Sequence, residues 1–447
     1  MAAEGRLGGP LSPMLRVRPP LRPGSPTMGL ASPVGPFAHG MGVSAVPSIL
    51  HLAFGESLRD QQFVTELCEA VVRRSGLGRS QAVISDTNRA LLRRTARLKA
   101  RTAAVRLTGR RRHDRRAMAQ AVAELGDLAP QLVHAHGFAA AAWAEALARR
   151  YRVPWTMSVL SPVPDHWQNR RQIWRASALA ALSLDALPRG LRNRATQIPG
   201  GLDKREFVPS AVAEMLMAEL GLNPYTLHLG LVGQFDDRRS GWADFLEAAA
   251  RVARRVPLVE FVIVGSGRDS AAMEHYAHQS GILGNTRFLG LRIDRSRIYH
   301  ALDVVVLPSH ETLFPWELLE AAAAGAPVIA TAIEPHQRMA AGDPSVTFYP
   351  AGDTAALADR LLAVVEGTGP GLSSDMVDLS LLGEGLHGVV RARISQTHYN
   401  VGDDELEELV DPDAPDTLRR RVMRDMEITQ IAKRYEALWD GVVASVR

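Results

Sequence analysis

Short apolar runs alternate with amphipathic stretches through the first half of the chain. The run at 48–54 stops at Gly55, as a buried parallel strand does, and a helix is predicted to follow at about 60–74. Further runs predict strands at 81–85, 131–136 and 153–160, and an Ala-rich stretch predicts a helix at 139–150. Strands that alternate with helices indicate a parallel α/β sheet.

The same alternation starts again after a Gly/Pro-punctuated stretch at 198–209. Helical stretches separate most of the apolar runs, which predict strands at 227–233, 259–265, 286–290, 304–308 and 327–331. The expected fold is therefore α/β, with two Rossmann-like doubly wound domains that face each other across a cleft at the carboxyl ends of both sheets.

Composition shifts divide the chain further. We expect a disordered Pro/Gly-rich extension at 1–45, a first Rossmann-like domain at 46–200, a hinge at 201–224, a second Rossmann-like domain at 225–365, a polar and acidic insertion at 366–415 and a closing amphipathic helix at 416–447. No run of eighteen apolar residues and no signal peptide are found, so a spanning helix is not expected and the predicted location is cytoplasmic.

Composition is that of a soluble globular protein, because 46% of the 447 residues are hydrophobic and 22% are charged. The single cysteine, Cys68, excludes an intramolecular disulfide and a multi-cysteine metal site, and is interpreted as a small buried hydrophobe. No HExxH motif or carboxylate cluster of metal-binding type occurs, so no metal site is expected. Nucleic acid is not an expected partner.

A basic stretch at 89–116 holds eleven arginines and Lys99 against the single acid Asp114. One interpretation is peripheral contact with an anionic membrane surface at the inner face of the membrane. The other is a solvated surface enriched in arginine by codon usage, because the chain has only three lysines among its 52 basic residues. The sequence leaves both open.

Glycine turns and one acidic helix carry the candidate chemistry. The turns within 231–241 and 264–267 follow predicted strands and can present backbone N–H groups to a phosphate, yet neither is a Walker loop or a complete GxGxxG. In 303–330 a buried strand, a polar loop and a helix follow in order, with Glu320 in the second helical turn. A carboxylate there can accept hydrogen bonds from two ribose hydroxyls, and the loop suits a diphosphate.

Together these segments resemble the retaining GT-B glycosyltransferases of family 4, also called glycosyltransferase group 1. The resemblance is carried by 132–137, 198–203, 231–233, 261–267, 287–290, 303–330 and 350–353. It implies retaining transfer of a sugar from a nucleotide-sugar donor, without a metal or other cofactor. It also places the donor on the domain at 225–365 and the acceptor on the domain at 46–200.

Residue by residue, Glu320 matches the family's ribose-binding glutamate. Thr312 stands where the donor-sugar glutamate is expected, and Glu311 lies one residue earlier. The resemblance implies a catalytic set of Glu311, Glu320 and His136, and a nucleotide-sugar set of Gly233, Gln234, Arg238, Arg239, Gly265, Thr312, Leu313, Phe314 and Glu320. For His134 and His136 a structural role, with one ring packed and the other hydrogen-bonded, is at least as well supported as catalysis.

Two departures from the family pattern keep a second function open. Gln234 replaces the arginine of the family's phosphate clamp and Ser240 replaces its lysine, although Arg238 and Arg239 lie in the same loop. The alternative is a catalytically silent GT-B subunit that serves a protein partner. A GT-B phosphorylase is excluded, because 225–365 contains no lysine to hold pyridoxal phosphate. The acceptor is left open as a glycan, a lipid or a small molecule.

Overall fold

The chain is described by a computed structural model over 48–54, 58–74, 81–86, 88–207, 213–223, 226–256, 258–292, 294–366 and 417–446. All of these residues belong to one unit of the chain, 45–447. The extension expected at 1–45 and the insertion expected at 366–415 lie outside the described residues, apart from Glu366.

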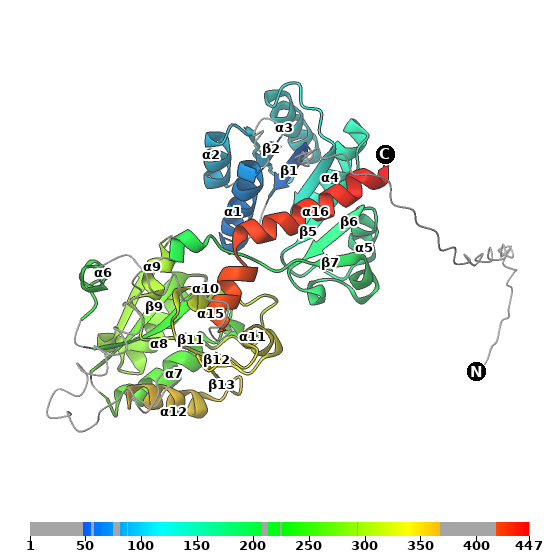
Figure 1. Ribbon diagram of the computed structural model, residues 1–447. Helices are drawn as coiled ribbons and strands as arrows, with labels where there is room; N and C mark the ends of the chain where they lie inside the picture. The colour runs from blue at the N-terminus through cyan, green and yellow to red at the C-terminus, as the bar shows by residue number, and fades with distance from the viewer. Residues whose placement is uncertain are drawn as a thin grey trace, which may run out of the picture. The chain divides into compact units, whose positions relative to one another are not determined.

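A seven-stranded parallel sheet in the order β3-β2-β1-β4-β5-β6-β7 forms the first half (Figure 1). Its strands are β1 (Ile49–Ala53), β2 (Gln81–Ser85), β3 (Arg101–Ala104), β4 (Leu132–His136), β5 (Trp155–Val159), β6 (Ala178–Ala181) and β7 (Ala195–Gln197). Every residue of β1, β2, β4 and β5 is buried, so both faces of the sheet are covered. These are the four strands that the apolar runs predicted, and they are confirmed.

Helices connect the strands of this sheet as expected for a doubly wound fold. They are α1 (Leu58–Arg74), α2 (Arg89–Arg97), α3 (Arg111–Glu124), α4 (Phe138–Tyr151) and α5 (Trp167–Trp174), with short 3-10 turns η2 (Leu184–Ala186), η3 (Arg189–Arg194) and η4 (Lys204–Phe207). After η4, helix α6 (Ala213–Leu220) leads into the second half.

The second sheet has six parallel strands in the order β10-β9-β8-β11-β12-β13. Its strands are β8 (Leu227–Gln234), β9 (Val259–Ser266), β10 (Thr286–Gly290), β11 (Val304–Leu307), β12 (Val328–Thr331) and β13 (Val346–Tyr349). The helical elements around it are η5 (Arg238–Ser240), α7 (Trp242–Ala253), α8 (Ser270–Gln279), η6 (Leu283–Asn285), α9 (Arg295–Tyr299), α10 (Trp316–Ala324), α11 (Glu334–Ala340) and α12 (Thr354–Val365). The expected α/β class with two doubly wound sheets is confirmed.

Two helices rather than one close the chain, α15 (Leu418–Asp425) and α16 (Ile428–Val446). The break occurs because Leu202 enters the backbone ladder, where its N–H donates to the carbonyl of Met426 and its carbonyl accepts from the N–H of Ile428. Glu427 then caps α16 by accepting from the backbone N–H of Thr429 at 2.8 Å. Helix α15 packs against α10, and α16 packs against α1 (Figure 1).

Candidate functional site

Glycines bring together the loops that follow β8, β9 and β11. Gly233 pairs with Gly265 across β8 and β9. A Cβ on Gly265, whose φ is +135°, would lie 1.8 Å from the carbonyl oxygen of Gly233, and a Cβ on Gly241, whose φ is +75°, would lie 1.9 Å from that of Pro308. Only glycine tolerates these approaches, so the loops lie backbone against backbone at the carboxyl edge of the second sheet.

An exposed ion pair joins two of these loops. Nη1 of Arg239 lies 2.5 Å from Oε1 of Glu311, and both side chains are 65% exposed. The N–H of His310 also donates to the carbonyl oxygen of Arg239 at 2.9 Å. Because an exposed pair of this kind contributes little to stability, both groups can exchange partners when a ligand arrives. The structure therefore brings together Arg239 and Glu311, two of the expected site residues.

The residues that replace the family's clamp are neutral and already hydrogen-bonded. Gln234 is exposed, and its amide donates to Oδ2 of Asp236. The hydroxyl of Ser240 donates to the carbonyl oxygen of Asp237 at 2.8 Å. Arg238 is exposed and pairs with no other described residue. Positive charge in this loop therefore comes from Arg238 and from Arg239, whose charge is paired with Glu311.

The loop before α10 is anchored by aromatic packing. Thr312 donates its hydroxyl to the carbonyl oxygen of Phe314 at 3.1 Å. The ring of Phe314 is buried against Trp316, with centroids 4.6 Å apart. Leu313 packs on the apolar core of the first sheet. Of these three expected binding residues, Phe314 and Leu313 hold the loop in place, and Thr312 is half-buried at its centre.

Glu320 is only 2% exposed and is surrounded by donors. Its Oε1 accepts from Nη2 of Arg295 at 2.9 Å and lies 3.0 Å from Nη2 of Arg59. Its Oε2 accepts from the hydroxyl of Tyr299 at 2.9 Å. Burial and the charge of Glu320 raise the pKa of Tyr299 well above its ordinary value, so Tyr299 remains a hydrogen-bond donor. Both carboxylate oxygens that were expected to meet the ribose therefore have protein partners.

Arg59 is a buried cation with unused donors. It lies in the first turn of α1, is 8% exposed, and places its guanidinium 4.3 Å from the ring centroid of Trp316. The nitrogens Nε, Nη1 and Nη2 make no hydrogen bond of good geometry within the described chain, although Nη2 is close to Glu320. Buried donors are normally satisfied, so this guanidinium is suited to an anionic ligand.

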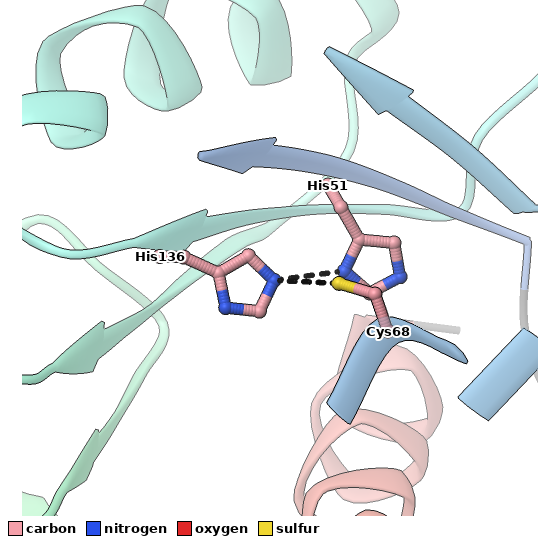
Figure 2. A group of neighbouring side chains, drawn as sticks. All are labelled: His51, Cys68 and His136. Atoms are coloured by element: carbon pink, nitrogen blue, oxygen red, sulfur yellow. Dashed lines mark hydrogen bonds between the residues drawn. The ribbon is translucent and has the colours of Figure 1, made fainter. Parts of the chain in front are cut away.

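His136 lies in the first sheet, away from the residues described above. It is the last residue of β4 and has no exposed surface. Its Nε2 lies 3.2 Å from Nδ1 of His51 and 3.5 Å from Sγ of Cys68 (Figure 2). Burial and the nearby His51 lower the pKa of His136 well below its ordinary value. The structure does not bring this imidazole together with Glu311 or Glu320.

The neighbouring His134 has a structural role, as one of the two sequence interpretations proposed. Its Nδ1 accepts from the indole N–H of Trp439 at 3.2 Å and lies 2.7 Å from the hydroxyl of Thr156. Its Nε2 lies 2.8 Å from the hydroxyl of Ser158. Because indole only donates, Nδ1 is the acceptor and Nε2 carries the proton. Both ring nitrogens are thus occupied.

The basic stretch at 89–116 covers α2, β3 and the start of α3. Part of it serves the fold, because Arg94 lies 2.5 Å from Glu69 and Arg101 donates to the carbonyl oxygen of Leu125 at 2.9 Å. The exposed arginines are Arg89, Arg93, Arg97, Arg106, Arg110, Arg112, Arg115 and Arg116. Within the described part of the chain, every helix is too short or too polar to cross a bilayer.

Sequence reasoning missed Arg59, Arg295 and Tyr299. Arg59 comes from the first half of the chain, and nothing local to it indicates that it approaches Glu320. Arg295 and Tyr299 lie on the short helix after β10, just beyond the segment 287–290 that carries part of the family resemblance. The position of α9 directly before β11 was the one available signal.

Residues 226–367 match the model of the family "Glycosyl transferases group 1". The matched segment contains the second sheet and the glycine loops, Glu311 and Glu320. This match supports the resemblance inferred from the motifs for the second half of the chain.

Curated relatives are also glycosyltransferases. The chain is 29% identical over 180 residues to the phosphatidyl-myo-inositol mannosyltransferase of Mycolicibacterium smegmatis, covering 39% of this chain and 44% of that protein. It is 32% identical over 145 residues to the D-inositol 3-phosphate glycosyltransferase of Corynebacterium jeikeium, covering 30% of this chain and 34% of that protein. The aligned part thus spans between a third and a half of each relative.

Solved structures share the fold over a longer stretch. HepE of Anabaena, solved with UDP and glucose, superposes with a TM-score of 0.59 at 16% identity and covers 81% of this chain and 99% of its own. Sucrose-phosphate synthase from Thermosynechococcus elongatus superposes with a TM-score of 0.59 at 18% identity and covers 89% of this chain and 100% of its own. At such identities the likeness shows the fold, which is the expected GT-B architecture.

Proposed function

We propose that this protein transfers a sugar from a nucleotide-sugar donor to an acceptor hydroxyl, with retention of anomeric configuration and without a metal in the transfer step. The donor binds at the carboxyl edge of the second sheet, within the segment that matches the group 1 model. The observation that carries the proposal is the buried group of Arg59, Arg295 and Glu320, in which Glu320 lies on α10, the helix that follows the loop of Glu311. It supplies cations where a diphosphate needs them.

Arg59 and Arg295 take over the charge that Gln234 and Ser240 lack. A departing nucleoside diphosphate gains negative charge as the sugar–oxygen bond breaks, and buried cations stabilise that charge more than exposed ones do. Nε and Nη1 of Arg59 have no hydrogen-bond partner among the described residues, and Arg295 is held in place by Glu320. In this account Glu320 orients the two guanidiniums, and a ribose can bind to it only by displacing one of its present partners.

Glu311 and Arg239 form the donor-sugar part of the site. Their ion pair is exposed, so a sugar hydroxyl can replace Arg239 as the hydrogen-bond partner of Glu311. Arg239, once released, lies in the loop after β8 with Arg238, near the diphosphate. In the transfer the anomeric carbon loses its bond to the diphosphate oxygen and gains one to the acceptor oxygen on the same face. The acceptor proton leaves with the diphosphate.

Inositol-containing acceptors are the first to test. Two relatives are named for phosphatidyl-myo-inositol and D-inositol 3-phosphate. The exposed arginines within 89–116 would hold an anionic lipid surface near the acceptor domain. A soluble inositol phosphate would need no such surface, so vesicle dependence of transfer separates these two acceptor classes.

A silent GT-B subunit that serves a protein partner is the second candidate. It is favoured by the neutral clamp residues and by the occupied carboxylate of Glu320. Such a subunit would keep the fold and lose donor binding, because its cleft would no longer bind the diphosphate of a nucleotide-sugar.

Thermal shift measurements on the full-length protein distinguish the two functions. Nucleoside diphosphates and nucleotide-sugars of each base are added separately, and binding to the folded state raises the melting temperature. A donor site predicts a rise for one base with both the diphosphate and a nucleotide-sugar. Calorimetry with the matching nucleoside then tests the role of Glu320. Glu320→Gln should lower the affinity for the nucleoside only if the carboxylate binds the ribose. Failure of every nucleotide to bind would favour the silent subunit.

A further inference from the structure

Three side chains that can bind metals converge beneath the first sheet. His51 comes from β1, Cys68 from α1 and His136 from β4, and all three are completely buried. Nδ1 or Nε2 of each histidine and Sγ of the cysteine lie within 4.8 Å of one another. Figure 2 shows Nε2 of His136 facing both Nδ1 of His51 and Sγ of Cys68. The chain has no other cysteine, so the sulfur at this centre is unique.

The two separations that involve His136 are those of ligands around one ion. Nδ1 of His51 and Nε2 of His136 are 3.2 Å apart, and Sγ of Cys68 is 3.5 Å from Nε2 of His136. Metal bonds of about 2.0–2.1 Å to nitrogen and about 2.3 Å to sulfur give tetrahedral ligand separations of about 3.3 Å between nitrogens and about 3.5 Å between nitrogen and sulfur. Two of the three separations therefore match tetrahedral coordination, and the third, between His51 and Cys68, is within 4.8 Å.

Protons alone do not satisfy the cluster. Nε2 of His51 lies 3.3 Å from Oε1 of Gln81, which accepts a hydrogen bond from the protonated Nε2, so the lone pair of Nδ1 faces His136. If Nε2 of His136 carries a proton, its buried Nδ1 becomes an acceptor that no described group fills. If Nε2 carries none, two lone pairs face each other at 3.2 Å. A cation between them removes the repulsion; Nδ1 of His136 then carries the ring's proton, which no described group accepts. The contact of His51 with Gln81 is the outer hydrogen bond typical of metal-bound histidine.

We propose that His51, Cys68 and His136 bind one soft d10 cation, Cu+ or Zn2+, through two imidazole nitrogens and one thiolate. Thiolate and imidazole together are the ligands that these two ions share. Binding transfers the thiol proton of Cys68 to solvent, and the thiolate charge is then balanced by the ion. Nearby His134 is not a ligand, because both of its nitrogens are occupied by hydrogen bonds.

The site would tie β1, β4 and α1 together and is separate from the transfer chemistry. No local motif predicts the site, because its ligands stand far apart at positions 51, 68 and 136. Metal that binds only the folded chain stabilises the fold, so removing it should lower the melting temperature.

Cobalt spectroscopy on the untagged full-length protein tests the site. The protein is stripped of metal with a chelator under reducing conditions and then titrated with Co2+. A thiolate-to-cobalt charge-transfer band in the near ultraviolet can arise only from Cys68. We expect this band to saturate at one ion per chain and to disappear when Zn2+ or Cu+ is added, and the ion that displaces cobalt at the lower concentration identifies the preferred metal. Elemental analysis of the purified protein should give about one such ion per chain.

Two variants complete the test. Cys68→Ser should abolish the band and the metal content, whereas His228→Gln, which removes a buried histidine of the second sheet, should retain both. Wild-type protein that shows neither the charge-transfer band nor stoichiometric Cu+ or Zn2+ binding would overturn the proposal, even if a variant fails to fold. Equal metal content in the wild type and Cys68→Ser would also overturn it.

Discussion

Replacing Arg59 with glutamine removes a buried guanidinium that makes little use of its hydrogen-bonding groups in the free protein. Its donors lack hydrogen-bond partners in the described chain, and Glu320 keeps Arg295 and Tyr299 when Arg59 is gone. The fold loses the stacking of the guanidinium on Trp316 at 4.3 Å, which contributes about 0.5–2 kcal/mol, and the ion pair with Glu320 at 3.0 Å, for which Arg295 remains as the counter-charge. The variant should therefore fold.

Donor binding should suffer more than folding does. Hydrogen bonds to a charged group contribute about 1.5–3 kcal/mol, and each 1.4 kcal/mol changes the dissociation constant about tenfold. If Arg59 contacts the diphosphate, Arg59→Gln should weaken nucleoside diphosphate binding by roughly ten- to a hundredfold. Calorimetry with the nucleoside diphosphate of the preferred base measures this directly. The corresponding nucleoside, which has no phosphate, should bind the variant and the wild type equally.

A matched control is Arg251→Gln, which makes the same substitution at an exposed arginine paired with Glu247 on α7. It should change neither stability nor binding. Unchanged diphosphate affinity in Arg59→Gln would refute the assignment of Arg59 to the diphosphate. An equal loss for nucleoside and diphosphate would show that the substitution disturbs the pocket rather than a phosphate contact.

Three further predictions concern stability and location. Glu320→Gln removes the carboxylate that pairs with Arg59 and Arg295, whose side chains are 9% and 17% exposed, and should lower the unfolding free energy by about 3–5 kcal/mol in urea denaturation; a loss under about 1 kcal/mol would contradict this. Burial raises the pKa of Glu66 from 4.5 to about 7, so the stability contributed by its protonated form is present below pH 4.5 and lost as pH rises through 7. Glu66→Gln should therefore gain stability over the wild type across that window, on the order of 3 kcal/mol, and parallel pH–stability curves would show that Glu66 titrates normally. If the basic stretch at 89–116 binds a membrane surface, more protein should sediment with anionic vesicles than with neutral vesicles, and added salt should reduce the difference. Equal partition onto both kinds of vesicle would show that the stretch is a solvated basic surface.

Most strands that the sequence predicted are buried on both faces; β10, which is largely half-buried, was predicted as well. β1, β2, β4, β8 and β9 are continuous apolar runs because both faces of a covered parallel sheet exclude water. β7 was missed because its three residues are half-buried or exposed, and β6 because Ala-Leu-Ala-Ala reads equally well as helix. The break between α15 and α16 was missed because it depends on Leu202, which lies far away in the sequence.

The candidate site could be predicted only as far as local motifs reach. The glycine loops and Glu320 stand in one short stretch each, so their arrangement at one sheet edge follows from the topology. The partners of Glu320 do not, because Arg59 approaches it from α1 in the first half of the chain. The cluster of His51, Cys68 and His136 could not be predicted for the same reason, because its members are far apart in the sequence. Strand order brings β1 beside β4, and Cys68 approaches from α1.

Sugar transfer itself is the most direct test of the central claim. Full-length protein is incubated with nucleotide-sugars of each base, together with inositol phosphate or anionic vesicles containing phosphatidylinositol, and the glycosylated product is followed by mass spectrometry and nuclear magnetic resonance. The account predicts a product whose anomeric configuration equals that of the donor, formed with one nucleotide base and much more slowly by Arg59→Gln. Wild-type protein that binds no nucleotide-sugar and releases no nucleoside diphosphate with any donor would contradict it.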